Sequence, residues 1–599
     1  MAANLCLLEL EEQVDSIPFS LNVSDDELIE WAKRREKRAR EVVGQLVDLR
    51  TAYQALADTA QRYGLAPPDP EKHGLEGAVK RLCDEQWWRR KLRQVHAQAL
   101  EGLAIQWGLV HKRAGIYISD ESFKRYQQKR TRNAQLFQVA ELINDLGQKY
   151  TLAELVALST ASLKNRRNEL MARMAGFQKL AFMLGHAPEF YTLTCPSKYH
   201  PRHSESCERN KRHDPDLTPK AAQDYLNRLW CRIRAKLKRS GIEVYGFRVA
   251  EPHHAGTPHW HTLLFMAPQH VEAVRAIFRE HCLAEDGDQP GAEKRRFDIR
   301  VIDYSKGTAT GYIAKYVAKS VDGHGIDSDL HGHDAKVSSQ RVTAWASLWG
   351  IRQFQQIGGP PVTVWRQLRR LAELKGIDEN PDLALLETAR QAADSGDWAA
   401  FVEVMNGPTA KRAVQPVKLH KEWGDQPNRY SEPVGYRIIG LACGAQVVRT
   451  RKRVWELRIH YRGEGGHLKD KPDPYSLKGA PGDGGEPFTL EDPSGPFRIE
   501  GPSKERNQSG AWEFHYGDVA AYSYELRKGL LTPAAARRER QRALRPWSPV
   551  NNCTRAEPPN HELTNSHSTG SEKTTHHSRT LPPVKGIIAN ASTVIKRFD

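Results

Sequence analysis

This chain of 599 residues lacks the features of several common protein classes. Its 8 cysteines form no disulfide-like framework, which favours a reducing compartment. No apolar run approaches the roughly 18–20 residues that span a bilayer. The first residues turn acidic early, unlike a signal peptide. We therefore expect a soluble protein of the cytoplasm, with no membrane partner.

Two enzyme motifs are also missing. The sequence has no Gly-x4-Gly-Lys-[Ser/Thr], so we expect no P-loop motor in the chain. It has no His-Glu-x-x-His, which disfavours a zinc hydrolase. Positive charge, by contrast, is in excess: 89 Lys and Arg face 73 Asp and Glu, a net charge of +16. This balance predicts a polyanionic partner, most commonly nucleic acid, and a merely basic soluble surface is the alternative.

Local sequence signals divide the chain into six segments. They are a helical region at 1–180, an α+β domain at 185–325, a helical extension at 326–405, a small β unit at 406–462, a linker with a basic helix at 463–545, and a disordered tail at 546–599. In the first segment we expect helices at 24–63, 76–114, 120–147 and 151–180. The second segment mixes strands with helices around a central hairpin, which predicts an antiparallel sheet with helices packed on it.

One stretch of the second segment offers a carboxylate and two imidazoles to a single ion. On a strand, residues i and i+2 point to the same side, so His259 and His261 project together. If the preceding strand pairs with this one as a hairpin, Glu251 lies near His259. An open set of nitrogen and oxygen ligands suits Mg²⁺ or Mn²⁺ beside a phosphate, and Zn²⁺ also accepts it. Two half-buried structural histidines are the alternative, and His253 and His254 are substitute ligands.

A helix expected at about 308–321 carries two phenols. At about 100° per residue, Tyr312 and Tyr316 lie some 40° apart on it, and Lys315 and Lys319 fall in the same arc. Tyrosines wedged at a core edge beside snorkelling lysines are the structural alternative. A phenol with a pKa near 10 is a poor nucleophile at neutral pH. A divalent ion that polarises a phosphate, and a lysine that stabilises the developing charge, would make attack on a phosphodiester feasible.

Other patterns have both a structural and a functional interpretation. Trp345 and Trp349 lie on one helical face with Arg352, and we expect them in the core rather than on a base-stacking surface. Four residues of zinc-binding type occur at no standard finger spacing: Cys195, His200, His203 and Cys207.

The His-hydrophobic-His strand followed by Tyr-x3-Tyr resembles the HUH endonuclease superfamily of rolling-circle initiators. More narrowly, Tyr-Thr-Leu-Thr-Cys-Pro and Gly-Tyr-Ile-Ala-Lys-Tyr-Val-Ala-Lys resemble the replication gene A proteins of temperate tailed phages, over about 185–375. This resemblance implies an HUH endonuclease fold and nicking of one strand at the phage origin. It makes His259 and His261 metal ligands, Glu251 an upstream acidic ligand, and Tyr312 and Tyr316 the nucleophiles that attach to the 5′ phosphate.

The resemblance also implies partners and a location. Origin DNA, single-stranded or supercoiled, would be the substrate, in the cytoplasm of a bacterial host. Because the chain lacks a P-loop, we expect a host helicase and the replication machinery as partners. The sequence leaves open an HUH-type transposase, a plasmid replication initiator, and a non-catalytic DNA-binding protein whose tyrosines are structural.

Overall fold

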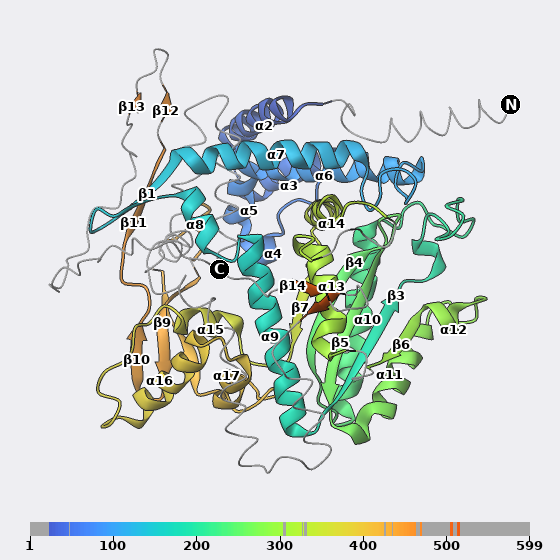
Figure 1. Ribbon diagram of the computed structural model, residues 1–599. Coiled ribbons are helices and arrows are strands. Elements are labelled where there is room, and N and C mark those ends of the chain that lie inside the picture. The colour runs from blue at the N-terminus through green and yellow to red at the C-terminus, as the bar shows by residue number, and fades with distance from the viewer. Residues whose placement is uncertain are drawn as a thin grey trace, which may run out of the picture.

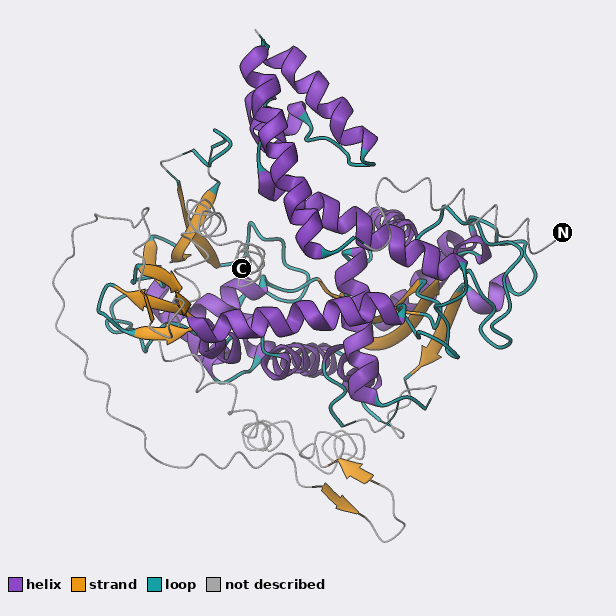
Figure 2. Ribbon diagram, turned by 90° about the horizontal axis from the view of Figure 1, so that it is seen from above, coloured by secondary structure: helices purple, strands orange, loops and turns teal. Residues whose placement is uncertain are grey.

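The computed structural model describes residues 23–46, 48–302, 307–325, 328, 332–424, 427–433 and 435–459, with two short strand pairs beyond them (Figures 1 and 2). Those pairs join β12 (Tyr461–Arg462) to β13 (Leu468–Lys469), and β14 (Lys504–Arg506) to β15 (Trp512–Phe514). The predicted linker with its basic helix, at 463–545, lies largely outside the described residues. The predicted disordered tail, at 546–599, lies wholly outside them.

The described part begins with a run of helices, as the sequence predicts. They are α2 (Asp25–Gln45), α3 (Leu49–Arg62), α4 (Pro70–His73), α5 (Leu75–Leu82), α6 (Glu85–Gln106) and α7 (Asp120–Val139). Ser24 and Glu27 cap α2 reciprocally, each accepting a hydrogen bond from the other's backbone N–H. The single helix expected at 24–63 is wrong, because α2 ends at Gln45 and the Asp48 carboxylate caps a new helix, α3.

The helix expected at 120–147 is also too long, because a strand replaces its last turns. β1 (Ala140–Asn144) pairs on one side with β2 (Lys149–Thr151) and on the other with β11 (Trp455–Ile459). Then come α8 (Leu152–Leu158) and α9 (Leu163–Leu184), which divide the expected helix at 151–180 in two.

A five-stranded antiparallel sheet of order β6-β3-β5-β4-β7 is the largest sheet of the described residues. Its strands are β3 (Ala187–Thr194), β4 (Tyr245–Pro252), β5 (Pro258–Met266), β6 (Phe297–Val301) and β7 (Phe354–Ile357). The mixed α+β class and the antiparallel pairing agree with prediction. The edge strand β7 was not predicted, because the sequence around it favours helices.

Helices cover both faces of this sheet. On one face, Phe190, Phe247 and Leu263 pack in a core with α9 and with α13 (Ala309–Val321). On the other face, Tyr191 and Trp260 pack with three further helices: α10 (Pro219–Arg239), α11 (Val271–Leu283) and α14 (Ala335–Trp349). Between α11 and β6 lies the short helix α12 (Ala292–Arg295). The face under α13 carries the candidate site.

The two tryptophans of α14 belong to the core, as predicted. Trp345 is fully buried and Trp349 nearly so. The Trp345 indole N–H donates to the Gly256 carbonyl, 2.8 Å away in the turn between β4 and β5. Because these rings are buried, neither can stack on a base.

A smaller antiparallel sheet of order β10-β9-β8 follows three helices. The helices are α15 (Val362–Leu368), α16 (Pro381–Asp394) and α17 (Trp398–Val404), and the strands are β8 (Val417–Trp423), β9 (Tyr436–Cys443) and β10 (Gln446–Arg449). One face of this sheet packs into the core through Val417 and Leu441. In Figure 1 strands β9 and β10 of this sheet lie on the opposite side of α9 from the five-stranded sheet.

The loop between β8 and β9 reaches the N-terminal helices. The Arg429 guanidinium lies 2.5 Å from the Asp84 carboxylate, and Arg81 forms a two-pronged ion pair with Glu432. Among the described residues, no helix is both long and apolar enough to cross a membrane.

Candidate metal and nucleophile site

The hairpin β4–β5 brings the predicted carboxylate and imidazoles together. Glu251 is the register partner of His259, and His261 lies two residues further on the same face. The turn closes when the His253 N–H donates to the Thr257 carbonyl at 2.7 Å. The hairpin expected from the sequence is therefore present.

The ligand atoms of Glu251, His259 and His261 all lie within 4.8 Å of one another, and no other described group of three such residues does so. The two Nε2 atoms are 2.9 Å apart, and Glu251 Oε2 is 3.9 Å from His261 Nε2. Adjacent ligands about 2.1 Å from an octahedral ion lie about 3.0 Å apart, so the imidazole spacing fits one ion. The donor set of two imidazoles and a carboxylate fits a divalent metal.

Burial sets the charge state of the two imidazoles. Glu251 is 1% exposed and His261 is 7% exposed. Burial holds the pKa of both imidazoles well below the usual value, and neighbouring His and Lys charges add to the effect. Both histidines are therefore neutral at physiological pH, the state in which imidazole binds a metal.

Two hydroxyls that the sequence did not single out support the ligands. Ser320 Oγ donates to Glu251 Oε1 at 2.9 Å, and Thr192 Oγ1 lies 3.2 Å from His261 Nδ1. Contacts of this kind orient ligands and tune the affinity for the metal. Ser320 lies on α13, one turn beyond Tyr316, so the tyrosine helix itself holds the carboxylate. Thr192 could have been found only from the strand register, which pairs it with His261.

Tyr316 contacts the ligand group directly. Its ring stacks on the His261 ring with centroids 4.0 Å apart, and on Phe190 at 5.6 Å. Burial raises the pKa of its phenol, and the Glu251 carboxylate raises it further. The phenol is therefore protonated at neutral pH in this state.

Tyr312 lies one turn earlier on α13. It is half-buried and packs at the edge of the core, and no described contact joins it to the three ligands. The helix confirms the prediction in its bounds and in its buried apolar side, with Ile313 and Val317 fully covered. The two tyrosines therefore share a face of the helix but not an environment.

The two lysines also differ. Lys315 is exposed, with its Nζ 5.2 Å from the centre of the Tyr316 ring. Lys319 Nζ lies 3.3 Å from Glu251 Oε2 and 5.4 Å from the centre of the Tyr117 ring, which belongs to the loop before α7. The sequence predicts a catalytic part for both lysines. In the structure, Lys319 pairs with Glu251, one of the three candidate ligands, and Lys315 lies at the surface.

The remaining histidines and cysteines form no second metal site among the described residues. The His253 ring lies 4.1 Å from the His259 ring, centre to centre, but His253 is not part of the ligand group. Cys195 Sγ faces the Ala222 carbonyl at 3.6 Å, and His200 Nε2 lies 3.2 Å from the Cys195 carbonyl oxygen. The four residues of zinc-binding type are therefore not gathered into one group of ligands.

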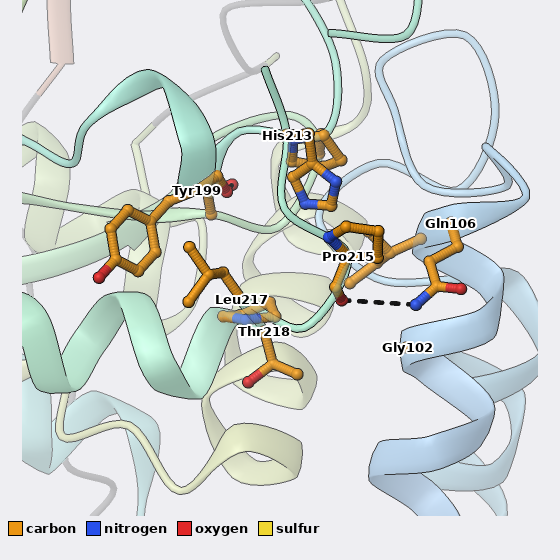
Figure 3. Close-up of a pocket in the computed structure, with 12 residues that line it drawn as sticks. Gly102, Gln106, Tyr199, His213, Pro215, Leu217 and Thr218 are labelled. Carbon is orange, nitrogen blue, oxygen red and sulfur yellow. Dashed lines mark hydrogen bonds between the residues drawn. The ribbon is translucent and has the colours of Figure 1, made fainter. Parts of the chain in front are cut away.

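A separate small pocket lies between α6 and the loop before α10 (Figure 3). Gln106 and Gly102 line it from α6, and Tyr199 and His213 line it from the loop. Gln106 Nε2 donates to the Pro215 carbonyl at 3.4 Å across its mouth. None of the three ligands lines this pocket, so it is distinct from the candidate site.

Comparison with known sequences places this geometry in a family. The profile of the bacteriophage replication gene A protein family matches residues 26–324. The probable replication protein P12 of Pseudoalteromonas phage PM2 is 34% identical over 492 residues, which are 75% of each chain. The chain belongs to the bacteriophage replication gene A protein family.

Other relatives of this family match over shorter parts of their own length. The replication gene A protein of Escherichia phage 186 is 37% identical, over 69% of this chain and 61% of that protein. A protein of Salmonella paratyphi A named "probable replication endonuclease from prophage-like region" is 32% identical, over 72% of this chain and 54% of that protein. The chain thus spans less than two thirds of these two relatives. No solved structure was found to match it.

Proposed function

We propose that this protein initiates phage DNA replication by nicking one strand at the origin and remaining attached to the 5′ phosphate. Family membership and the names of the relatives, which include a probable replication endonuclease, support a nuclease that acts on DNA. The observation that carries the proposal is a ring contact. The Tyr316 ring stacks on the ring of His261, a member of the candidate ligand group, with the ring centres 4.0 Å apart. The domain would be of the HUH endonuclease type.

Each side chain has a defined part in this chemistry. Glu251, His259 and His261 would hold Mg²⁺ or Mn²⁺. The bound ion would polarise the scissile phosphate and stabilise negative charge on it. The Tyr316 oxygen attacks phosphorus, the new O–P bond forms as the P–O3′ bond breaks, and the phenol proton is released while the 3′ oxygen leaves as a hydroxyl. Lys315 neutralises the phosphate from the solvent side.

The phosphotyrosine link makes the reaction reversible. Because one phosphodiester replaces another, a 3′ hydroxyl can attack the link and rejoin the strand without ATP. The second phenol, Tyr312, would cut the regenerated origin while Tyr316 still holds the old 5′ end. On a helix, side chains four residues apart have Cβ atoms about 5–6 Å apart, which keeps both phenols near one ion.

The other parts of the proposal concern organisation and partners. We propose residues 185–325 as the nicking domain and 326–405 as its helical extension. Origin DNA would be the substrate in the cytoplasm of the bacterial host. A host helicase would unwind the duplex, because the sequence contains no P-loop.

Formation of a covalent adduct tests the proposal. The full chain is incubated with Mg²⁺ and an oligonucleotide that carries the cognate origin, labelled on the 3′ side of the nick. Label should travel with the protein on a denaturing gel. Tyr316→Phe should lose most of the adduct, Tyr312→Phe should retain it, and the double variant should form none. An adduct in the double variant would place the nucleophile elsewhere, and no adduct with the wild-type protein would favour a DNA-binding protein without catalysis.

A further inference from the structure

Two large aromatic side chains lie exposed side by side on the smaller sheet. Trp423 ends β8 and Tyr436 begins β9, and the strand register pairs them directly. Trp423 is 57% exposed and Tyr436 is 55% exposed. Their ring centres are 4.1 Å apart and the planes are inclined by 39°. The pair is outside the site described above, on the smaller sheet, whose strands β9 and β10 lie on the other side of α9 in Figure 1.

Cross-strand aromatic pairs stabilise hairpins, and that role alone could account for their contact. It does not account for their exposure, because burial is the usual source of aromatic stabilisation. Both residues remain more than half exposed, so a flat apolar partner can still cover them.

The segment that forms the smaller sheet is rich in basic residues. Between residues 417 and 455 the sequence has 8 Lys and Arg against 3 Asp and Glu. Lys421 is exposed, two residues before Trp423 on the same side of β8. The neighbouring Glu422 carboxylate pairs with Arg449, and Lys421 has no carboxylate partner among the described residues. An exposed stack beside an unneutralised ammonium group is complementary to a base next to a phosphate.

We propose that Trp423 and Tyr436 form a platform on which bases of single-stranded DNA stack, with Lys421 contacting the backbone. Proteins that bind single strands without sequence preference combine stacking aromatics with basic surfaces in this way. This inference rests on the proposed function in one respect: the purpose of the platform would be to hold a strand near the nicking domain. Its ligand, single-stranded DNA of any sequence, is distinct from the origin.

The test measures binding of a fluorescein-labelled oligo-dT, which carries no origin, to the full chain by fluorescence anisotropy at fixed salt. Trp423→Ala and Tyr436→Ala should each weaken binding about tenfold, as expected for loss of one stacked base. Trp423→Phe and Tyr436→Phe retain a ring and should bind within about twofold of wild type, because phenylalanine also stacks. Trp107→Ala is the matched control, since Trp107 is 40% exposed at the end of α6.

Thermal unfolding is followed on the same samples. If the alanine variants lower the melting temperature but bind oligo-dT normally, the pair only stabilises the hairpin or meets a protein partner, and the proposal is overturned. Equal loss in the phenylalanine variants, or in Trp107→Ala, would overturn it too. Adduct formation on origin DNA is scored separately, so oligo-dT binding that depends on Trp423 would support the platform even if no adduct formed.

Discussion

Replacing Ser320 with alanine tests whether the tyrosine helix positions the metal ligand. Glu251 is 1% exposed, and its two oxygens are held from α13: Oε1 by the Ser320 hydroxyl at 2.9 Å, and Oε2 by the Lys319 ammonium at 3.3 Å. A hydrogen bond to a charged group contributes about 1.5–3 kcal/mol. Loss of a contact that orients a ligand typically weakens metal binding about 10- to 100-fold. The free energy expected for the hydrogen bond and the expected loss of metal affinity therefore agree.

We therefore expect Ser320→Ala to bind Mn²⁺ at least about tenfold more weakly by isothermal titration of the full chain. Ser339→Ala is the matched control, because this buried serine also lies on a helix, where its hydroxyl donates to the Lys336 carbonyl at 2.8 Å. Glu251→Gln should lose Mn²⁺ binding. This variant checks that the titration measures binding at this site. Wild-type affinity in Ser320→Ala, or an equal loss in Ser339→Ala, would refute a positioning role for the Ser320 hydroxyl.

Two further predictions concern the ligands and the core. Replacing both His259 and His261 with alanine should abolish adduct formation and leave DNA binding, measured by anisotropy, intact. EDTA should have the same two effects on the wild-type protein. An adduct that survives either treatment would remove the metal from the mechanism. Glu169→Ala should lower the free energy of unfolding by roughly 2–4 kcal/mol in chemical denaturation, because it leaves the largely covered Arg366 without its two-pronged partner. Glu121→Ala, which removes an exposed ion pair, should cost less than about 1 kcal/mol, and equal losses would contradict the argument.

The parts of the site that were predicted are those encoded locally. His259 and His261 alternate on one strand, and Glu251 precedes them across a short turn, so the hairpin register follows from neighbouring residues. The helix bearing Tyr312 and Tyr316 carries its own apolar side and begins one residue from its expected start. Periodicity alone was enough for both elements.

The parts that were missed depend on distant pairing. Residues 140–144 continue a helical pattern, but their partner strand is 455–459, which no local window contains. Ser320 and Thr192 gained a role only when the fold placed one against Glu251 and the other against His261. Before the register is known, a serine on a helix and a threonine on a strand carry no signal of their own.

The structure also separates two residues that the sequence made equivalent. Helical spacing puts both phenols on one face of α13, yet Tyr316 stacks on His261 while Tyr312 packs at the core edge. If the ligand group holds the phosphate as proposed, that phosphate would lie next to Tyr316 rather than next to Tyr312. The proposed order of the two cuts, Tyr316 first and Tyr312 second, would then follow from this difference. Because Ser320 and Lys319 tie that same helix to Glu251, a shift of α13 would move the ligand and the nucleophile together.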